Sequence, residues 1–403
     1  IGGLTAQASS VTIGQSNNSN PELAGYKLNS GMIGSVDAAT TVAVYSDVAG
    51  SVAAAEGQTV KSGTTVTVGT ASVPNRNNIG KIEAGSSITI YGAEGAAIGD
   101  LEANTSVSIG SAAAPNQSAV GNITAGTTVG VYNGETGSVG TVTAGSTVTV
   151  GASTSPNAGQ VGDIDTDGGV NVYNGSAIIG TIEAGSTVNL YGNAGDIGNV
   201  TSSASISVGG YNKTEANAAG QVGNEGEIGS LTAGTSVTVY RNTGTIGDLT
   251  SQTTSVSIGQ GNNATEAIRT YNANSGTIGS VDAATTVTIH SGHVPSGSVA
   301  AEGTVTAGTS VTLGTVSYPN YNTVGAIEAP TVSGYTAVDV GTIRADSNRL
   351  VNATAGEGVS VITISGNATL TADENGQITV NGNTYPAGSK LVVNSAATVT
   401  ISG

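Results

Sequence analysis

The stretch that decides the fold is Val120–Tyr132, which reads Val-Gly-Asn-Ile-Thr-Ala-Gly-Thr-Thr-Val-Gly-Val-Tyr. It opens with an apolar-Gly-x-apolar step and turns at Ala125-Gly126-Thr127. It ends in Thr128–Val131, where apolar residues alternate with small ones. Alternation with a period of two is typical of a β-strand with one buried face. The stretch therefore predicts a unit of strand, turn, strand and turn.

The same apolar-Gly-x-apolar step recurs along the chain. It begins at Ile33, Ile79, Ile98, Val120, Val139, Val161, Ile179, Ile197, Ile228, Ile246, Ile278, Val324 and Val340. Between Ile79 and Ile197 the steps are 19, 22, 19, 22, 18 and 18 residues apart, which is about one coil of a parallel β-helix. We expect an all-β parallel β-solenoid of roughly 16 coils, because single coils bury little and stacked coils share a core.

Two longer periods overlie the coil. Coils alternate between ending in Tyr and ending in Gly, and Tyr91, Tyr132 and Tyr173 are 41 residues apart, so the genetic unit is a pair of coils. Residues 1–82 also match residues 246–327 at an offset of 245. That offset is close to six coil pairs and indicates duplication of a block.

The pattern weakens after about Pro330. We expect residues 1–345 to form the solenoid, with coils of 18–22 residues, and residues 346–403 to form a separate C-terminal β module. The module contains strand-like runs such as Val361–Ile364 and Ile378–Val380. Because an exposed last coil is an unpaired edge, the module is expected to cap the solenoid or to dock a partner.

Composition excludes several classes of function. Ten Lys and Arg stand against 27 Asp and Glu, a net charge of −17, which opposes binding to nucleic acid and to anionic membranes. Cysteine is absent, so neither a disulfide framework nor a thiolate metal site is available. The sequence contains no run of about 18 apolar residues, so no transmembrane helix is predicted. Phe and Trp are also absent, so Val, Ile, Leu and Ala must fill the interior.

The N-terminal residues Ile1, Gly2, Gly3 and Leu4 align with residues 246–249, so the chain begins directly on a repeat. The absence of a starting Met predicts a mature form after removal of a signal peptide, with an extracellular or cell-surface location. An open first coil predicts head-to-tail association with another copy of the chain. These four residues are the expected assembly site.

Asp163, Asp165 and Asp167 form the best metal candidate. With Gly168 they copy the first half of a calcium-binding EF-hand loop, in which alternating carboxylates converge on the ion. Asn174 stands where the bidentate Glu belongs, so a strand edge and turn with acidic substitutions is the alternative. No other cofactor is expected.

Two further patterns resemble sites for chemistry. His290 and His293 are spaced as a zinc pair, but His290 occupies the repeat position of Tyr45 and is also explained as an outward aromatic substitute. Acidic residues such as Glu83 and Glu183 recur once per coil, whereas glycan cleavage needs grouped carboxylates. We therefore expect a surface ladder of charges and no enzyme activity.

Strand positions facing outward carry Ser and Thr, as at Thr147 and Thr149, and all 13 aromatic residues are Tyr. Hydroxyl ladders are typical of ice-binding solenoids, although Gly130 interrupts this one. Tyr rings could stack on glycans or on a neighbouring fibre. The alternative is a Tyr ladder that seals a corner of the solenoid.

The apolar-Gly steps, Ala-Gly-Thr turns and Ser/Thr/Val strands of residues 1–343 resemble those of prokaryotic β-solenoid surface fibres and adhesins. The resemblance implies secretion, durability, and either self-assembly or adhesion. The favoured function is a structural subunit of an extracellular filament or cell-surface fibre that assembles head-to-tail. A monomeric β-helical adhesin or passenger domain that binds glycans is the alternative, followed by an ice-binding or polysaccharide-active β-helix.

Overall fold

The computed structural model describes residues 2–14, 29–46, 48–210, 223–259, 273–290, 297–315, 318–338, 340–352, 360–364, 367–372, 377–381, 383–385, 390–393 and 398–401. Every regular element within these ranges is a β-strand. The strands form stacked parallel coils, so the expected all-β parallel solenoid is confirmed. The chain divides near Asn199 into two compact units, of which the second begins at Val200.

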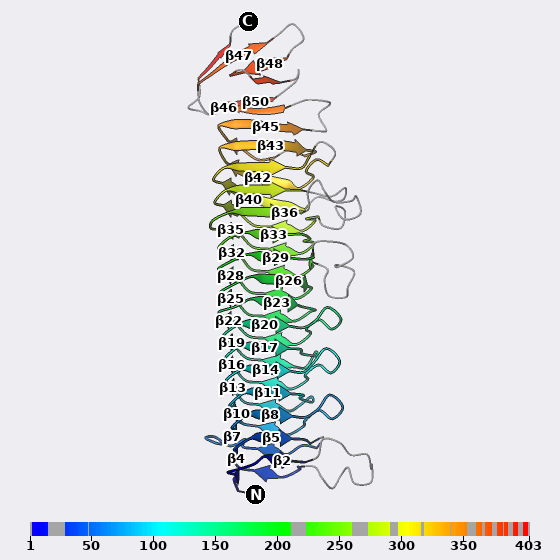
Figure 1. The fold of residues 1–403 in the computed structure, drawn as a ribbon. Helices are drawn as coiled ribbons and strands as arrows, with labels where there is room; N and C mark the ends of the chain where they lie inside the picture. The colour runs from blue at the N-terminus through cyan, green and yellow to red at the C-terminus, as the bar shows by residue number, and fades with distance from the viewer. Residues whose placement is uncertain are drawn as a thin grey trace. The chain divides into compact units, whose positions relative to one another are not determined.

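Coils of the first unit contribute one longer strand to one sheet, called sheet A, and one strand to a second sheet, called sheet B (Figure 1). From the second coil on, a short strand precedes the longer strand in sheet A. The longer strands of sheet A are β1 (Leu4–Ala6), β4 (Val36–Ala38), β7 (Thr59–Ser62), β10 (Lys81–Ala84), β13 (Leu101–Ala103), β16 (Ile123–Ala125), β19 (Val142–Ala144), β22 (Ile164–Thr166) and β25 (Ile182–Ala184). The short strands are β3 (Met32–Ile33), β6 (Ser51–Val52), β9 (Asn78–Ile79), β12 (Ala97–Ile98), β15 (Ala119–Val120), β18 (Ser138–Val139), β21 (Gln160–Val161), β24 (Ile178–Ile179) and β27 (Asp196–Ile197). Sheet B contains β2 (Val11–Ile13), β5 (Thr41–Val44), β8 (Thr65–Val68), β11 (Ser87–Ile90), β14 (Ser106–Ile109), β17 (Thr128–Val131), β20 (Thr147–Val150), β23 (Val170–Tyr173) and β26 (Val188–Asn193).

The second unit repeats this plan. Its sheet-A strands are β28 (Val200–Ser202), β31 (Glu227–Ile228), β32 (Leu231–Ala233), β34 (Thr245–Ile246), β35 (Leu249–Ser251), β37 (Thr277–Ile278), β38 (Val281–Ala283), β40 (Ser298–Ala307), β42 (Thr323–Glu328) and β44 (Ile343–Arg344). Its sheet-B strands are β29 (Ile206–Val208), β30 (Gly223–Asn224), β33 (Val237–Val239), β36 (Ser255–Ile258), β39 (Thr286–Ile289), β41 (Ser310–Leu313), β43 (Thr331–Thr336) and β45 (Ser347–Asn352). In β40 and β42 the short and longer strands of sheet A have merged across a register shift.

The end of the chain departs from parallel stacking. β46 (Ser360–Ile364) pairs antiparallel with β45 and parallel with β50 (Lys390–Val393). A separate four-stranded sheet follows, made of β47 (Ala368–Ala372), β48 (Ile378–Val380), β49 (Asn383–Tyr385) and β51 (Val399–Ile401). A C-terminal β sheet is therefore present, and the proposed boundary at residue 345 stays a prediction.

The core consists of stacked aliphatic side chains. In sheet A, Ile82 pairs in register with Leu101, and Leu101 pairs with Ile123. All three side chains are at most 1% exposed. Because alternate residues of a strand point to opposite faces, every second residue joins the core and those between face outward. Parallel, in-register pairing thus places side chains of the same type at the same position in successive coils.

Two glycines show why the repeat keeps this residue at its corners. A Cβ on Gly126 would collide with the carbonyl oxygen of Asn104 in the coil below. Gly151 adopts a φ of 69°, which L side chains rarely take, as the chain leaves β20. The close approach of successive backbones therefore selects glycine where coils turn.

Candidate functional surfaces

The outward residues of the sheet-A strands form one column in the first unit. Strand register places them on successive coils in the order Thr5, Asp37, Lys61, Glu83, Glu102, Thr124, Thr143, Asp165 and Glu183. Charged and uncharged residues share this column. Sheet A is therefore the charged face of the unit.

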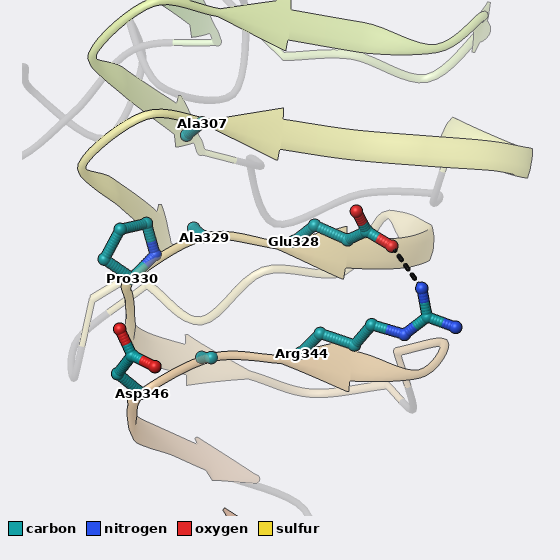
Figure 2. A pocket seen from close by; sticks show the side chains of 7 residues that line it. Ala307, Glu328, Ala329, Pro330, Arg344 and Asp346 are labelled. Atoms are coloured by element: carbon teal, nitrogen blue, oxygen red, sulfur yellow. Dashed lines mark hydrogen bonds and ion pairs between the residues drawn. The ribbon is translucent and has the colours of Figure 1, made fainter. Parts of the chain in front are cut away.

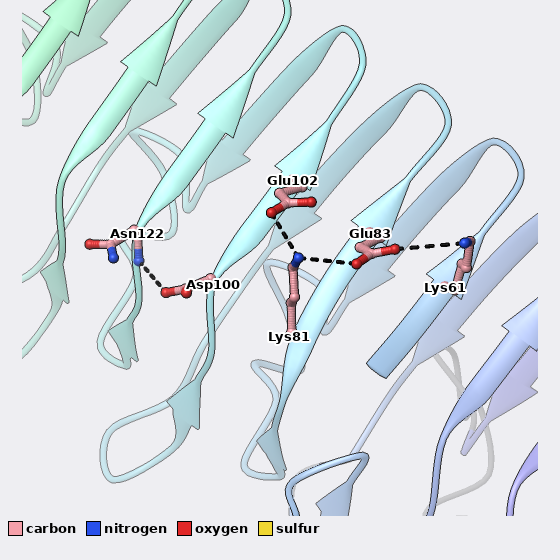
Figure 3. A network of polar contacts seen from close by, with 6 residues as sticks. All are labelled: Lys61, Lys81, Glu83, Asp100, Glu102 and Asn122. Atoms are coloured by element: carbon pink, nitrogen blue, oxygen red, sulfur yellow. Dashed lines mark hydrogen bonds and ion pairs between the residues drawn. The ribbon is translucent and has the colours of Figure 1, made fainter. Parts of the chain in front are cut away.

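Lysines separate the carboxylates in one part of this column (Figure 3). Lys81 Nζ lies 2.7 Å from Glu102 Oε1 and 3.1 Å from Glu83 Oε1, and Lys61 Nζ lies 3.8 Å from Glu83 Oε2. Hydrogen bonds to Glu102 and Glu83 raise the pKa of Lys81 above 10.5. Because these groups are exposed, each pair stabilises the fold by only about 0.2–1 kcal/mol. The network relieves the repulsion between two stacked carboxylates.

The predicted calcium residues belong to one extended segment and point to different places. Asp163 Oδ1 accepts a hydrogen bond from the backbone N–H of Thr181, one coil further on, at 2.8 Å. Asp165 projects outward from β22 in register with Glu183, and Asp167 follows at the next corner. Among the residues that the structure describes, no group of three or more His, Cys, Asp or Glu is arranged to hold a metal ion. Calcium binding stays a prediction.

The hydrogen bond of Asp163 belongs to a recurring contact that sequence reasoning missed. Asp100 Oδ1 accepts the backbone N–H of Asn122 at 2.8 Å, and Asn122 Oδ1 in turn accepts that of Thr141 at 3.0 Å. In the second unit Asp248 Oδ1 accepts the N–H of Ser280 at 2.8 Å. The third residue of the apolar-Gly-x-apolar step therefore joins one coil to the next, and its recurrence as Asp or Asn was the available signal.

The other candidates for chemistry are dispersed. Glu83 and Glu102 are adjacent but bridged by Lys81. His290 follows β39, where burial lowers its pKa below 6.5, and its backbone N–H donates to Ile258 O at 2.8 Å. His293 lies outside the described residues. The structure thus leaves zinc binding by this pair a prediction.

A ladder of buried asparagines lines one corner of the coils, where the chain passes from a sheet-B strand to the next short strand of sheet A. Its members are Asn75, Asn77, Asn116, Asn133, Asn157, Asn174 and Asn193 in the first unit, and Asn224, Asn242, Asn274, Asn320 and Asn322 in the second, all at most 3% exposed. Asn116 Nδ2 donates to Asn133 Oδ1 at 3.0 Å, and Asn242 Nδ2 donates to Asn274 Oδ1 at 2.9 Å. The same amides also donate to backbone carbonyls, so the corner is closed by hydrogen bonds in place of apolar packing.

Two of these asparagines stand in a sequence context that is typical of turns. Asn116 follows Pro115 and Asn157 follows Pro156, a pattern that is typical of exposed turns. Their recurrence at a 41-residue spacing was the signal for a buried ladder. Buried amides need partners. Asn116 Nδ2 finds one locally, at Ser118 O, and gains the other, Asn133 Oδ1, only when the next coil stacks.

The outward face of sheet B in the first unit carries small hydroxyl residues. One column contains Thr65, Ser87, Ser106, Thr128 and Thr147, and a second contains Thr67, Thr89, Ser108, Gly130 and Thr149. Half-buried tyrosines border these columns at the ends of the strands, and the rings of Tyr173 and Tyr191 stack with centroids 4.7 Å apart. We call this surface the hydroxyl face.

An open pocket of about 360 Å³ lies on the sheet-A side of the second unit. Arg344 Nη1 pairs with Glu328 Oε1 at 2.6 Å at one end, and Pro330 and Asp346 lie at the other (Figure 2). Ala307, Ala329 and Ala345 also line it. Pro330 stands where other coils have the corner glycine, and its carbonyl accepts the N–H groups of Asp346 and Ser347.

Three of the four expected assembly residues, Gly2, Gly3 and Leu4, lie on the first coil. Ile1 is outside the described residues, and Gly2 and Gly3 are exposed. Leu4 is half-buried in β1 and pairs in register with Val36 of β4. The structure therefore places Leu4 in the stacking direction of the coils, and its role in assembly stays a prediction.

Comparison with known proteins identifies no relative: no family model, no curated protein and no solved structure matches the chain. Among the described residues, no helix is long and apolar enough to cross a membrane. The fold therefore defines the class, a parallel β-solenoid, and function must be argued from its surfaces.

Proposed function

We propose that this chain is a structural subunit of an extracellular filament or cell-surface fibre that assembles head-to-tail. The observation that carries the proposal is the uniform stacking of the coils. In the first unit each sheet-A strand pairs with its neighbours in parallel and in register, from Leu4 with Val36 to Ile164 with Ile182. A coil supplied by another copy can add with the same backbone pairing and the same aliphatic core. Such heterologous contacts produce filaments when they do not close.

Electron microscopy of negatively stained protein at several concentrations tests the proposal. We expect filaments whose length grows with concentration. Leu4→Asp places a charge in the stacking direction and should shorten them, whereas Thr5→Asp adds the same charge on the exposed face and should not. Discrete particles of one length at every concentration would contradict head-to-tail assembly.

Folding of the first coil must be separated from assembly. Circular dichroism and thermal unfolding of both variants supply that control. A second measurement adds fluorescent protein to short preformed filaments. Elongation by the Thr5→Asp protein, and its loss in a folded Leu4→Asp protein, are the expected results.

A further inference from the structure

The hydroxyl face differs from the rest of the first unit in its charge. The hydroxyl columns occupy β8 to β20, and the flanking strands β2, β5, β23 and β26 continue the same face with uncharged outward residues such as Ala43, Asn171 and Asn189. The outward residues of these nine sheet-B strands include no Asp, Glu, Lys, Arg or His. Sheet A of the same unit carries Asp37, Glu83, Glu102, Asp165 and Glu183 on its outward column. With a net charge of −17 for the chain, two copies repel least when they approach through this uncharged face.

The chemistry of the face is complementary to itself. A hydroxyl group is both a donor and an acceptor, so an identical face can satisfy it. Threonine has few side-chain conformers, which lowers the entropy lost on docking. The columns repeat at the spacing of the strands, about 4.8 Å, and a second copy has the same spacing by construction.

The tyrosines that border the hydroxyl face are placed so that a second copy can approach it closely. The ring of Tyr132 lies over Gly130, with its Cε2 atom 3.4 Å from where a Cβ of Gly130 would stand. The rings of Tyr173 and Tyr191 stack with an angle of 19° between their planes. The rings are thus positioned beside the short hydroxyl side chains, and half-buried tyrosines are typical of protein interfaces.

The area is sufficient for a specific contact. At about 4.8 Å per strand and about 3.3 Å per residue, the nine sheet-B strands, seven of which have four residues, present roughly 570 Å². Two copies would bury roughly 1,100 Å², above the threshold of about 1,000 Å² for a specific interface. Small, identical side chains in register can interdigitate between two sheets without bound water.

From these observations we infer that the hydroxyl face pairs laterally with the hydroxyl face of a second copy of this chain. The contact is isologous and closes as a dimer. It is independent of head-to-tail assembly, which uses the ends of the stack. In a filament it would join two strands of subunits side by side.

Two variants with the same chemical change test the inference. Thr89→Lys places an ammonium group at the centre of the hydroxyl face, and Thr124→Lys places one on the exposed column of sheet A. Both are made in a Leu4→Asp background, and sedimentation equilibrium measures the mass. We expect a dimer for the parent and for Thr124→Lys, and at least a tenfold higher dissociation constant for Thr89→Lys, because burying unpaired cations is costly.

The results separate this inference from the filament proposal. If the unaltered chain forms closed dimers and no filaments, lateral pairing stands without head-to-tail assembly. A parent protein that stays monomeric, or equal dimerisation of both Lys variants, would overturn lateral pairing. So would a monomer that sediments with microcrystalline cellulose and loses that binding with Thr89→Lys, because the occupant of the face would then be a neutral glycan. Circular dichroism of each variant confirms that it is folded.

Discussion

Asn174 Nδ2 donates to Asn193 Oδ1 at 2.7 Å, which joins two buried side chains of successive coils. Both residues are at most 3% exposed. Asn174 Nδ2 also reaches Ala177 O at 2.9 Å, so one amide links its own coil and the next. A polar group that replaces apolar packing in this way depends on its partners, since an unpaired buried amide is destabilising.

The asparagine ladder predicts a large effect for Asn116→Ala. Asn116 bonds Asn133 Oδ1 and Ser118 O, and its Oδ1 accepts the Ser118 hydroxyl at 2.7 Å. Truncation removes the partner of the buried Asn133 Oδ1 and of the buried Ser118 hydroxyl, and it should cost about 1–3 kcal/mol. Asn104→Ala, at an exposed corner, is the control and should change stability by less than about 0.5 kcal/mol. Urea unfolding midpoints measure both, and equal midpoints would contradict a stabilising ladder.

The corner glycine predicts opposite outcomes for two Gly→Ala changes four residues apart. Alanine at position 126 meets the carbonyl oxygen of Asn104 and should destabilise the fold by about 1–3 kcal/mol. Alanine at position 130 meets only the edge of Tyr132 at 3.4 Å. There the lower entropy of the unfolded chain should leave stability unchanged or raise it by about 0.4–1 kcal/mol. Thermal unfolding of Gly126→Ala and Gly130→Ala distinguishes the two, and a tolerated Gly126→Ala would show that the corners can separate.

The inter-coil acceptor predicts that charge is dispensable at Asp163. Asp163→Asn keeps an oxygen for the N–H of Thr181 and should be nearly neutral, whereas Asp163→Ala should cost about 0.5–1.5 kcal/mol. Unfolding is measured in EDTA. Adding calcium then tests the metal prediction separately. A calcium-dependent rise in the unfolding midpoint that Asp165→Asn abolishes would support a calcium site.

His290 predicts part of the pH dependence of stability. Burial lowers its folded pKa below 6.5, so the unfolded chain binds the proton more readily. The contribution of neutral His290 to the free energy of unfolding is therefore complete above pH 6.5. It is lost as the pH falls from 6.5 toward the lowered pKa of the folded state. The variant His290→Tyr carries the residue found at Tyr45 in the matching repeat and should lack this component. Melting temperatures between pH 7.5 and 5 check it, and identical pH profiles would exclude the contribution of His290.

Much of the fold could be predicted from one repeat. The stretch Val120–Tyr132 predicted two strands joined at Ala125-Gly126-Thr127, and the structure has β16 and β17 on either side of that corner. The strand register was implied by repeated spacing. The surfaces were harder, because the partner of Asp163 is Thr181, in a different coil, and nothing local identifies it.

The sequence by itself determined the parallel stack, because its period of two within strands and its 18–22-residue coil leave one way to bury the aliphatic residues. The tertiary structure decided what each polar residue does. Stacking turned asparagines that resemble turn residues into a buried ladder, and it separated charged residues on sheet A from hydroxyl residues on sheet B. These outcomes depend on which atoms of neighbouring coils come into contact. The spacing of residues along the sequence does not specify those contacts.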